Sequence, residues 1–312
     1  MSAADEFGEI ARLFRPLTRG AAGAFDLLDD AAVVPQRPGF DLVITKDAVV
    51  AGVHVPSGEA PGLVARKLVR VNLSDLAAKG AEPFAAFLGV AWPAVYGPTE
   101  REAFAAGLGA DLEAWGVSLL GGDTVSTPGP LTASLTALGW VAEGRMVRRA
   151  GARPGHLLMV SGPIGDGWLG LGAVRGEVAD PDGYLAGRYR LPNPRLDLRA
   201  TLRGGASAAA DISDGLVADA RHIAEASGVR LTLDLDRMPV SPAGAAWLAD
   251  QADPSAARLR LATGGDDYEI VCTGPAPLHG FTVVGDVSEG EDVVVRSAGR
   301  TLDPGAGGWR HG

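Results

Sequence analysis

Apolar residues along the first half of the chain alternate between the spacing of strands and the spacing of helices. Short continuous runs of apolar and small residues predict buried strands, and they fall at 41–45, 84–92, 117–120 and 131–142. The run at 117–120 is expected to end where GGDT begins. Apolar residues at every third or fourth position predict helices, and these segments fall at about 6–15, 61–80 and 99–115.

The second half shows the same alternation. Strands are expected at 157–162, 231–235, 268–273, 281–287 and 292–296, and helices at 168–174, from Pro194 onward and at 216–226. Strands that alternate with helices predict an α/β (α+β) fold. Glycine, proline and charged residues are mixed at 148–156, which is typical of a boundary. We therefore expect two domains, 1–148 and 149–312.

One position breaks the pattern of the expected helix at 61–80. Val64, Leu68 and Val71 lie in helical register, and the next step of that register falls on Asp75. Two interpretations are open for this carboxylate. Either Ser74 or Asp75 caps a second, short helix, or the carboxylate is placed there to bind a ligand.

The composition narrows the class of protein. The chain has 312 residues, of which 46% are hydrophobic and 21% charged, as in a globular protein of two domains. The net charge of −10 argues against nucleic acid as a partner. A single cysteine, Cys272, excludes a disulfide framework and a cysteine-rich metal site. No apolar run reaches the ~18 residues of a membrane span, and no signal pattern opens the chain. We expect a cytoplasmic protein with no membrane partner.

Aspartates beside glycine or another small residue recur at the ends of the apolar segments. They are Asp29, Asp30, Asp47, Asp75, Asp123, Asp211, Asp214, Asp266 and Asp267. One such loop is an ordinary turn, but ligand sites in α/β folds gather at the carboxyl ends of strands. Mg²⁺ prefers oxygen ligands, and with bound Mg²⁺ an acidic pocket attracts a polyphosphate. The whole set therefore indicates a metal-dependent nucleotide site.

Two common nucleotide-binding patterns are absent from the sequence. They are G-x-x-x-x-G-K-[ST] of P-loop proteins and H-R-D-x-x-x-x-N of protein kinases. The stretch GDGWLG at 165–170 matches the G-x-G-x-x-G of dinucleotide-binding proteins, between an expected strand and an expected helix. In a chain with 44 glycines, a tight turn between strand and helix explains this stretch better.

Five motifs, in order and spacing, resemble those of the thiamine-monophosphate kinase family. They are DAVVAGVH at 47–54, VNLSDLAAKGA at 71–81, LGGDT at 120–124, DISDGL at 211–216 and GGDDYE at 264–269. The resemblance runs from FGEIARLF near the start to GGW near the end. The superfamily of this family includes aminoimidazole ribonucleotide synthetase, selenophosphate synthetase and a hydrogenase maturation protein.

The resemblance implies a fold and an activity. It implies a homodimer, with a β-barrel formed across the interface by the N-terminal ATP- and Mg²⁺-binding domains and a separate C-terminal α/β domain. It implies Mg²⁺-assisted transfer of the γ-phosphoryl group of ATP to thiamine monophosphate, the final step of thiamine diphosphate biosynthesis. The acceptor phosphate is already an anion, so no catalytic general base is expected.

The resemblance also implies residue roles. The Mg²⁺ ligands are expected to be Asp30, Thr45, Asp47, Asp75, Asp123, Asp211 and Asp214. ATP contacts are expected from Gly122, Asp123, Arg149 and Ser213, and contacts to thiamine monophosphate from His54, Asp266 and Trp309.

Three positions depart from the family pattern. The stretch at 26–30 lacks the glycines usual before the first metal aspartate, and Asp266 stands where glutamate is typical. Lys46 stands where a small hydroxyl residue is common. This lysine either replaces part of the charge of one Mg²⁺ site or reaches a phosphate as a point charge.

Simpler interpretations remain open. His54 could be an ordinary residue at a strand end, Trp309 could close the core, and either Arg148 or Arg149 could be the ATP contact. Two other functions are also open: a sibling enzyme of the superfamily with another acceptor, and a non-catalytic dimer that binds Mg²⁺ and nucleotide. Selenophosphate synthetases usually carry a reactive cysteine or selenocysteine in an N-terminal glycine-rich loop, which this chain lacks.

Overall fold

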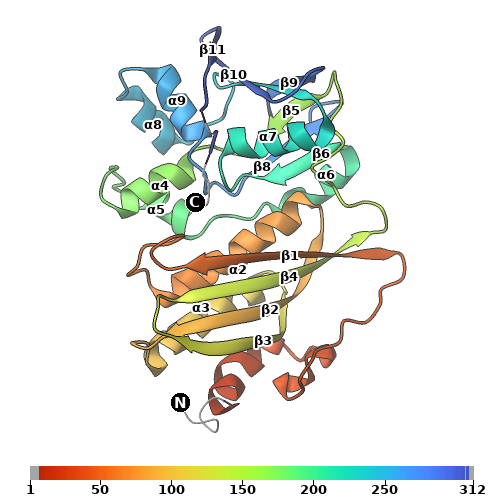
Figure 1. Ribbon diagram of the computed structural model, residues 1–312, viewed down its shortest axis with the longest axis vertical. Coiled ribbons are helices and arrows are strands. Elements are labelled where there is room, and N and C mark those ends of the chain that lie inside the picture. Colours follow the sequence, from red (N-terminus) through yellow and green to blue (C-terminus); the bar gives the residue numbers. More distant parts are fainter. Residues whose placement is uncertain (1–6, 306, 309–312) are drawn as a thin grey trace. The chain divides into compact units, whose positions relative to one another are not determined.

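The computed structural model in Figure 1 describes residues 7–305, 307 and 308. The chain forms two compact units, Met1–Leu76 with Ala81–Gly144, and Ala77–Gly80 with Arg145–Gly312. Both units contain a sheet with helices, so the predicted α/β (α+β) class is confirmed. The functional division predicted for 1–148 and 149–312 stays a prediction, as does the barrel across a dimer interface.

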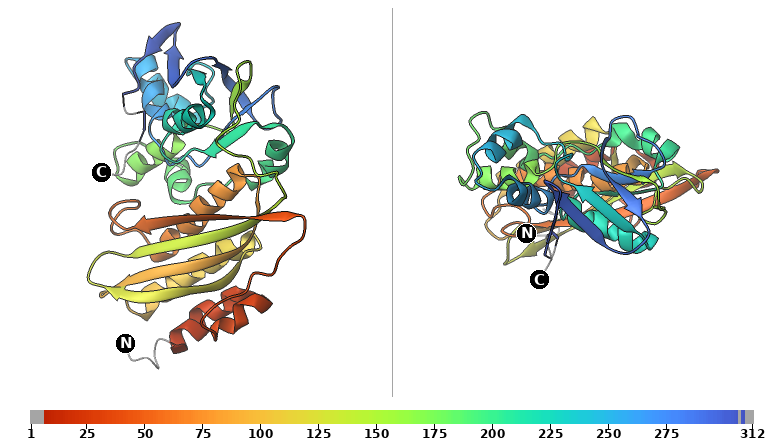
Figure 2. Two further views of the ribbon diagram at one scale, coloured as in Figure 1. Left: turned by 45° about the vertical axis from the view of Figure 1, so that its right-hand side comes forward. Right: turned by 90° about the horizontal axis from the view of Figure 1, so that it is seen from above.

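The first unit is built on a four-stranded sheet with the order β1-β4-β2-β3 (Figure 1). Its strands are β1 (Phe40–Val50), β2 (Glu82–Pro93), β3 (Ser118–Thr127) and β4 (Thr132–Ala142). β4 is antiparallel to β1 and β2, and β2 is parallel to β3. Two helices, α2 (Pro61–Ala78) and α3 (Pro98–Ala114), cover one face of the sheet (Figures 1 and 2).

The N-terminal segment packs on the opposite face of this sheet. It consists of η1 (Ile10–Phe14), η2 (Arg15–Thr18) and η3 (Ala22–Leu27). Ala24 of η3 is buried in one cluster with Ala85, Leu120 and Leu138 of the sheet. This cover is partial, because large apolar side chains elsewhere on the sheet remain exposed.

Helices α2 and α3 touch each other through glycine backbones. A Cβ on Gly107 would lie 2.2 Å from the carbonyl oxygen of Gly62, and one on Gly62 would lie 2.9 Å from that of Ala103. Beside this contact, Arg66 and Arg70 of α2 both donate to the buried carboxylate of Asp111 on α3. The small residues and the ion pair together fix the position of α2 against α3.

We expect Gly107→Ala to lower the free energy of unfolding by about 2 kcal/mol, because overpacking against backbone costs more than the ~1 kcal/mol that alanine gains in a helix. Urea denaturation measures this change. Gly187→Ala in another helix is the matched control, since a Cβ at Gly187 meets no atom within 4 Å. Equal stability of the two variants would contradict the close packing of α2 on α3.

The second unit is built on a seven-stranded mixed sheet with the order β11-β10-β7-β9-β5-β8-β6. Its strands are β5 (Leu157–Val160), β6 (Ala208–Asp211), β7 (Arg230–Asp234), β8 (Ile270–Gly274), β9 (Thr282–Ser288), β10 (Val293–Ser297) and β11 (Arg300–Leu302). Its helices are α4 (Asp166–Val174), α5 (Tyr184–Arg190), η4 (Leu196–Leu198), α6 (Arg199–Gly205), α7 (Leu216–Ser227), α8 (Pro242–Ala249) and α9 (Pro254–Ala262). Ile223 of α7 and Leu231 of β7 belong to its main core.

One expectation about local structure was wrong, and one of the two open interpretations of Asp75 is excluded. The strand expected to end at 120 continues as β3 through Gly121, Gly122 and Asp123, because these residues pair with β2 after a bulge. The second helix that Ser74 or Asp75 would have capped does not exist, because α2 continues through both residues to Ala78. No helix of the described part of the chain is long and apolar enough to cross a bilayer.

Candidate active site

Thr45 and Asp47 of β1 lie on the face of the sheet that α2 covers. Alternate residues of a strand point to the same face, and the cross-strand partners of these two, Ala137 and Leu135, are buried in that face. The Thr45 hydroxyl donates to Asp75 Oδ2 at 2.5 Å. Asp75 therefore breaks the apolar register of α2 because it faces a polar position on β1. The structure brings together three of the predicted metal ligands.

Asn72 is a residue of this site that the sequence did not reveal. Its side chain is fully buried, and its Oδ1 accepts the backbone N–H of Asp47 at 3.0 Å while its Nδ2 donates to Leu68 O at 2.9 Å. Residues three apart share one face of a helix, so Asn72 and Asp75 face β1 together. The available signal was a second polar residue on the apolar face of α2.

Asp123 lies on the other face of the same sheet. The ladder pairs Asp123 with Gly89, Gly89 with Ser134, and Ser134 with Ala48. Ala48 follows Asp47 directly, so Asp123 and Asp47 point to opposite faces. β3 and β1 are also at opposite edges of the sheet, about 14 Å apart at three strand spacings. The chain by itself does not bring Asp123 to the Thr45–Asp47–Asp75 cluster.

Lys46 points to the same face as Asp123, because it neighbours Thr45 and Asp47 on β1. It is exposed, and its Nζ donates to Ser134 Oγ at 3.4 Å. Gly122 sits where a Cβ would lie 2.0 Å from Leu88 O, so the fold itself requires glycine there.

The remaining predicted residues of the first unit lie in loops. Asp30 is exposed in the segment between η3 and β1. His54 lies in the turn after β1, where its Nδ1 accepts the Val50 N–H at 3.0 Å. That bond places the proton of the neutral imidazole on Nε2.

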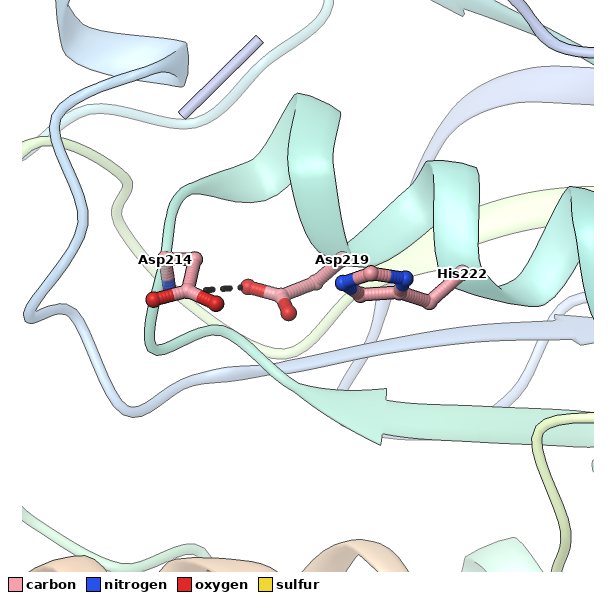
Figure 3. Close-up of side chains that lie close together, drawn as sticks. All are labelled: Asp214, Asp219 and His222. Atoms are coloured by element: carbon pink, nitrogen blue, oxygen red, sulfur yellow. Dashed lines mark hydrogen bonds between the residues drawn. The ribbon is translucent and has the colours of Figure 1, made fainter. Parts of the chain in front are cut away.

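In the second unit, Asp211 is the buried last residue of β6, and Ser213 and Asp214 lie in the loop between β6 and α7. Asp219, from the first turn of α7, accepts the N–H of Ser213 at 3.0 Å. It also accepts the N–H of Asp214 at 3.1 Å, the bond drawn in Figure 3. Burial raises the pKa of Asp219 to about 7, and the charge of Asp214 acts in the same direction. Asp219 was missed from the sequence because its partners are backbone groups.

Figure 3 also shows His222 beside Asp219 on α7. Asp214, Asp219 and His222 offer ligand atoms that lie within 4.8 Å of one another, within the part of the chain that the structure describes. Asp219 already accepts two backbone N–H bonds. These two bonds hold the loop that carries Ser213 and Asp214.

Arg149 and Asp266 lie close to the same loop. The charge of Arg149 acts to lower the pKa of Asp219, against the larger effect of burial, so Arg149 lies within electrostatic reach of this loop. The backbone N–H of Asp266 donates to Ser213 O at 2.8 Å, so the DISDGL and GGDDYE loops are joined. Trp309 lies outside the described residues.

The sequence was compared with those of known proteins. Residues 28–141 match the AIR synthase related protein N-terminal domain, and residues 153–297 match the AIR synthase related protein C-terminal domain. Thiamine-monophosphate kinase of Caulobacter vibrioides is 55% identical to the chain over 98% of the chain and 91% of that protein. The chain belongs to the thiamine-monophosphate kinase family.

Solved structures of thiamine-monophosphate kinase family members resemble the whole chain. The enzyme from Stenotrophomonas maltophilia has a TM-score of 0.79 at 33% identity, covering 93% of this chain and 98% of that one. A structure described as AaThiL complexed with AMPPCP and TMP has a TM-score of 0.80 at 30% identity, covering 93% and 97%. Both units therefore have the fold of the family.

Proposed function

We propose that the chain transfers the γ-phosphoryl group of ATP to the phosphate of thiamine monophosphate, giving thiamine diphosphate and ADP. The observation that carries this proposal is the 55% identity to a thiamine-monophosphate kinase along nearly the whole chain. The complex of a 30% identical relative with AMPPCP and TMP is consistent with an ATP-dependent reaction. The cytoplasm stays the expected location.

The oxygen atoms around Asp75 suit Mg²⁺. Asp47, Asp75 and Thr45 offer carboxylate and hydroxyl oxygens, which are the ligands of this hard cation, and Thr45 and Asp75 are already in contact. We assign Asp30, Asp123, Asp211 and Asp214 as further ligands. When bound, Mg²⁺ supplies charge neutralisation between an anionic donor and an anionic acceptor.

The chain's own residues position the two substrates. Gly122, Arg149 and Ser213 contact ATP in this proposal, and His54 Nε2, Asp266 and Trp309 contact thiamine monophosphate. Because the acceptor oxygen is already ionised, the protein contributes orientation and electrostatic stabilisation rather than a general base.

We also propose that the active form is a homodimer. Large apolar side chains are exposed on the sheet face that carries Asp123, namely Phe40, Leu42, Ile44 and Val125, at 37–58% exposure. Such a patch is typical of a protein interface. A second copy on this face would cover it, and the edge strand β1 that carries Asp47 would then lie at the border of the interface.

The test is a phosphoryl-transfer assay with ATP, Mg²⁺ and thiamine monophosphate, with unphosphorylated thiamine as the control acceptor. Equal amounts of ADP and thiamine diphosphate, and none from thiamine, are expected. ADP without thiamine diphosphate would instead identify a sibling enzyme with another acceptor. Nucleotide binding without ADP formation would identify a non-catalytic dimer.

Lys46 gives a separate prediction. In Lys46→Thr a fixed positive charge is lost, so at limiting Mg²⁺ we expect the KM for ATP to rise about tenfold, equivalent to ~1.4 kcal/mol. At saturating Mg²⁺ the KM should recover, because an additional ion replaces the charge. Arg300→Thr, at an exposed position on β11, is the control. A KM that is independent of Mg²⁺ would refute charge replacement by Lys46.

A further inference from the structure

The GDGWLG stretch at 165–170 has a role that nucleotide binding does not account for. It follows β5 and opens α4, and its backbone N–H groups surround a carboxylate of the chain itself. Gly165 N–H donates to Asp267 Oδ1 and Oδ2 at 3.0 and 2.9 Å, and Gly167 N–H donates to Oδ1 at 2.9 Å. Asp267 is 1% exposed, so its buried carboxyl group already occupies the position between these N–H groups where a phosphate could otherwise bind.

The glycine turn also lies in backbone contact with the loop that carries Asp267. A Cβ on Gly167 would lie 2.2 Å from the carbonyl oxygen of Asp266, and a Cβ on Gly264 would lie 2.4 Å from Cβ of Trp168. Only glycine permits such an approach. The glycines at 165–167 are therefore explained by the packing of the GGDDYE loop.

This packing holds Asp266 in an unfavourable backbone conformation. Asp266 has φ of 61° and Tyr268 has φ of 51°, a region that residues other than glycine rarely adopt. Such a conformation persists only where its surroundings hold it. Asp267 holds the loop on one side, and the N–H groups of Asp266 and Tyr268 bond to Ser213 O and Ile212 O on the other.

A basic side chain completes the support. Arg188 Nη2 donates to the carbonyl oxygen of Asp267 at 3.2 Å and to the Glu269 carboxylate at 3.1 Å. Asp267 is thus fixed through both its side chain and its backbone. Its neighbour on the same loop, Asp266, is half-buried, and the backbone from which its side chain projects is held by these contacts.

We propose that Asp267, held by the Gly165–Gly167 turn, is a positioning residue that fixes Asp266 for contact with thiamine monophosphate. This inference rests on the proposed function and on the assigned contact of Asp266. The effect is expected mainly on the acceptor, because Asp266 is the assigned acceptor contact and its loop bonds Ser213 only through the backbone carbonyl oxygen of Ser213.

The test compares Asp267→Asn with Asp180→Asn. Asp180 also accepts two backbone N–H bonds at a helix start, from Leu185 and Ala186, but it is outside the GGDDYE loop. In Asp267→Asn the side-chain NH2 group would face the N–H of Gly165, two donors without an acceptor, and the loop would shift. We therefore expect the KM for thiamine monophosphate to rise about ten- to a hundredfold. The KM for ATP should stay within about twofold, and Asp180→Asn should change neither.

A double-mutant cycle separates positioning from general stability. In an Asp266→Ala background, Asp267→Asn should raise the KM for thiamine monophosphate little further, because the group that it positions is gone. Additive effects in this cycle would overturn the inference, as would an Asp267→Asn protein with the wild-type KM. If Asp267→Asn does not fold, Gly167→Ala displaces the same loop with every charge kept, and the same KM change is expected.

The outcomes also separate this inference from the proposed function. A wild-type protein that forms no thiamine diphosphate would overturn both. If the wild-type protein is active, a KM for thiamine monophosphate that is raised in Asp266→Ala and unchanged in Asp267→Asn would overturn the role of Asp267 alone. Wild-type activity with an unchanged KM in Asp266→Ala would overturn the contact on which the inference rests.

Discussion

The Asp75→Asn protein is expected to fold normally and to lose phosphoryl transfer by about a thousandfold, the upper range for removing one electrostatic group from an active site. The amide oxygen can still accept the Thr45 hydroxyl, so the contact between α2 and β1 is kept. The negative charge that favours a cation is lost. The rate of thiamine diphosphate formation, with circular dichroism as the measure of folding, tests this expectation.

Asp41→Asn provides a matched control on the same sheet. Asp41 lies on β1, and its carboxylate accepts the Gly144 N–H at 2.8 Å, away from the Thr45–Asp47–Asp75 cluster. We expect this variant to keep its activity. Wild-type turnover by Asp75→Asn would remove Asp75 from the metal ligands, and its contact with the Thr45 hydroxyl would then be its structural role.

The pattern of apolar residues was sufficient to predict most of the strands. It failed at β3, where GGD was interpreted as a turn because glycine and aspartate are turn residues. In the structure Gly121 and Asp123 pair with β2 after a bulge, and this pairing depends on a strand more than thirty residues earlier. Local composition does not contain that information.

The short helices were harder to predict than the sheets. α8 and α9 carry proline in the first turn and capping bonds from Ser241 and Asp253, but neither was recognised. Each is short and has only one buried side on the core of the second unit. Their apolar periodicity is therefore limited to two turns, too few to distinguish a helix from a loop.

The sequence predicted those site residues whose side chain type itself suggests metal or phosphate binding. The aspartates of the acidic motifs stand out by type, and the motif resemblance gave them roles. Asn72 and Asp219 were missed, and Asp267 was grouped with the metal-site aspartates, because each of the three acts on backbone N–H groups, respectively of Asp47, of the DISDGL loop and of the glycine turn. Their partners are identified only once the chain is folded.

A mixture of two inactive variants, Asp75→Asn and Asp123→Asn, is expected to regain activity. The register of the sheet places Asp123 on the face opposite Asp47 and about 14 Å from β1, three strand spacings away. One nucleotide site that uses both Asp75 and Asp123 then takes them from different chains. In a mixed dimer, one site carries both substitutions and the other carries neither.

Co-expression with two different affinity tags, followed by two-step purification, isolates the mixed dimer. If the two variants pair at random, about half of the dimers are mixed, and each mixed dimer has one intact site out of two. An unfractionated mixture should therefore reach roughly a quarter of wild-type turnover. The purified mixed dimer should reach about half, while each variant alone stays inactive. No recovery would mean that Asp123 serves the site of its own chain or none. In a single chain, the sheet register keeps Asp123 away from the Asp75 cluster. Recovery would therefore show that the nucleotide site is completed by a second chain, as expected if the exposed apolar face is the interface of a homodimer.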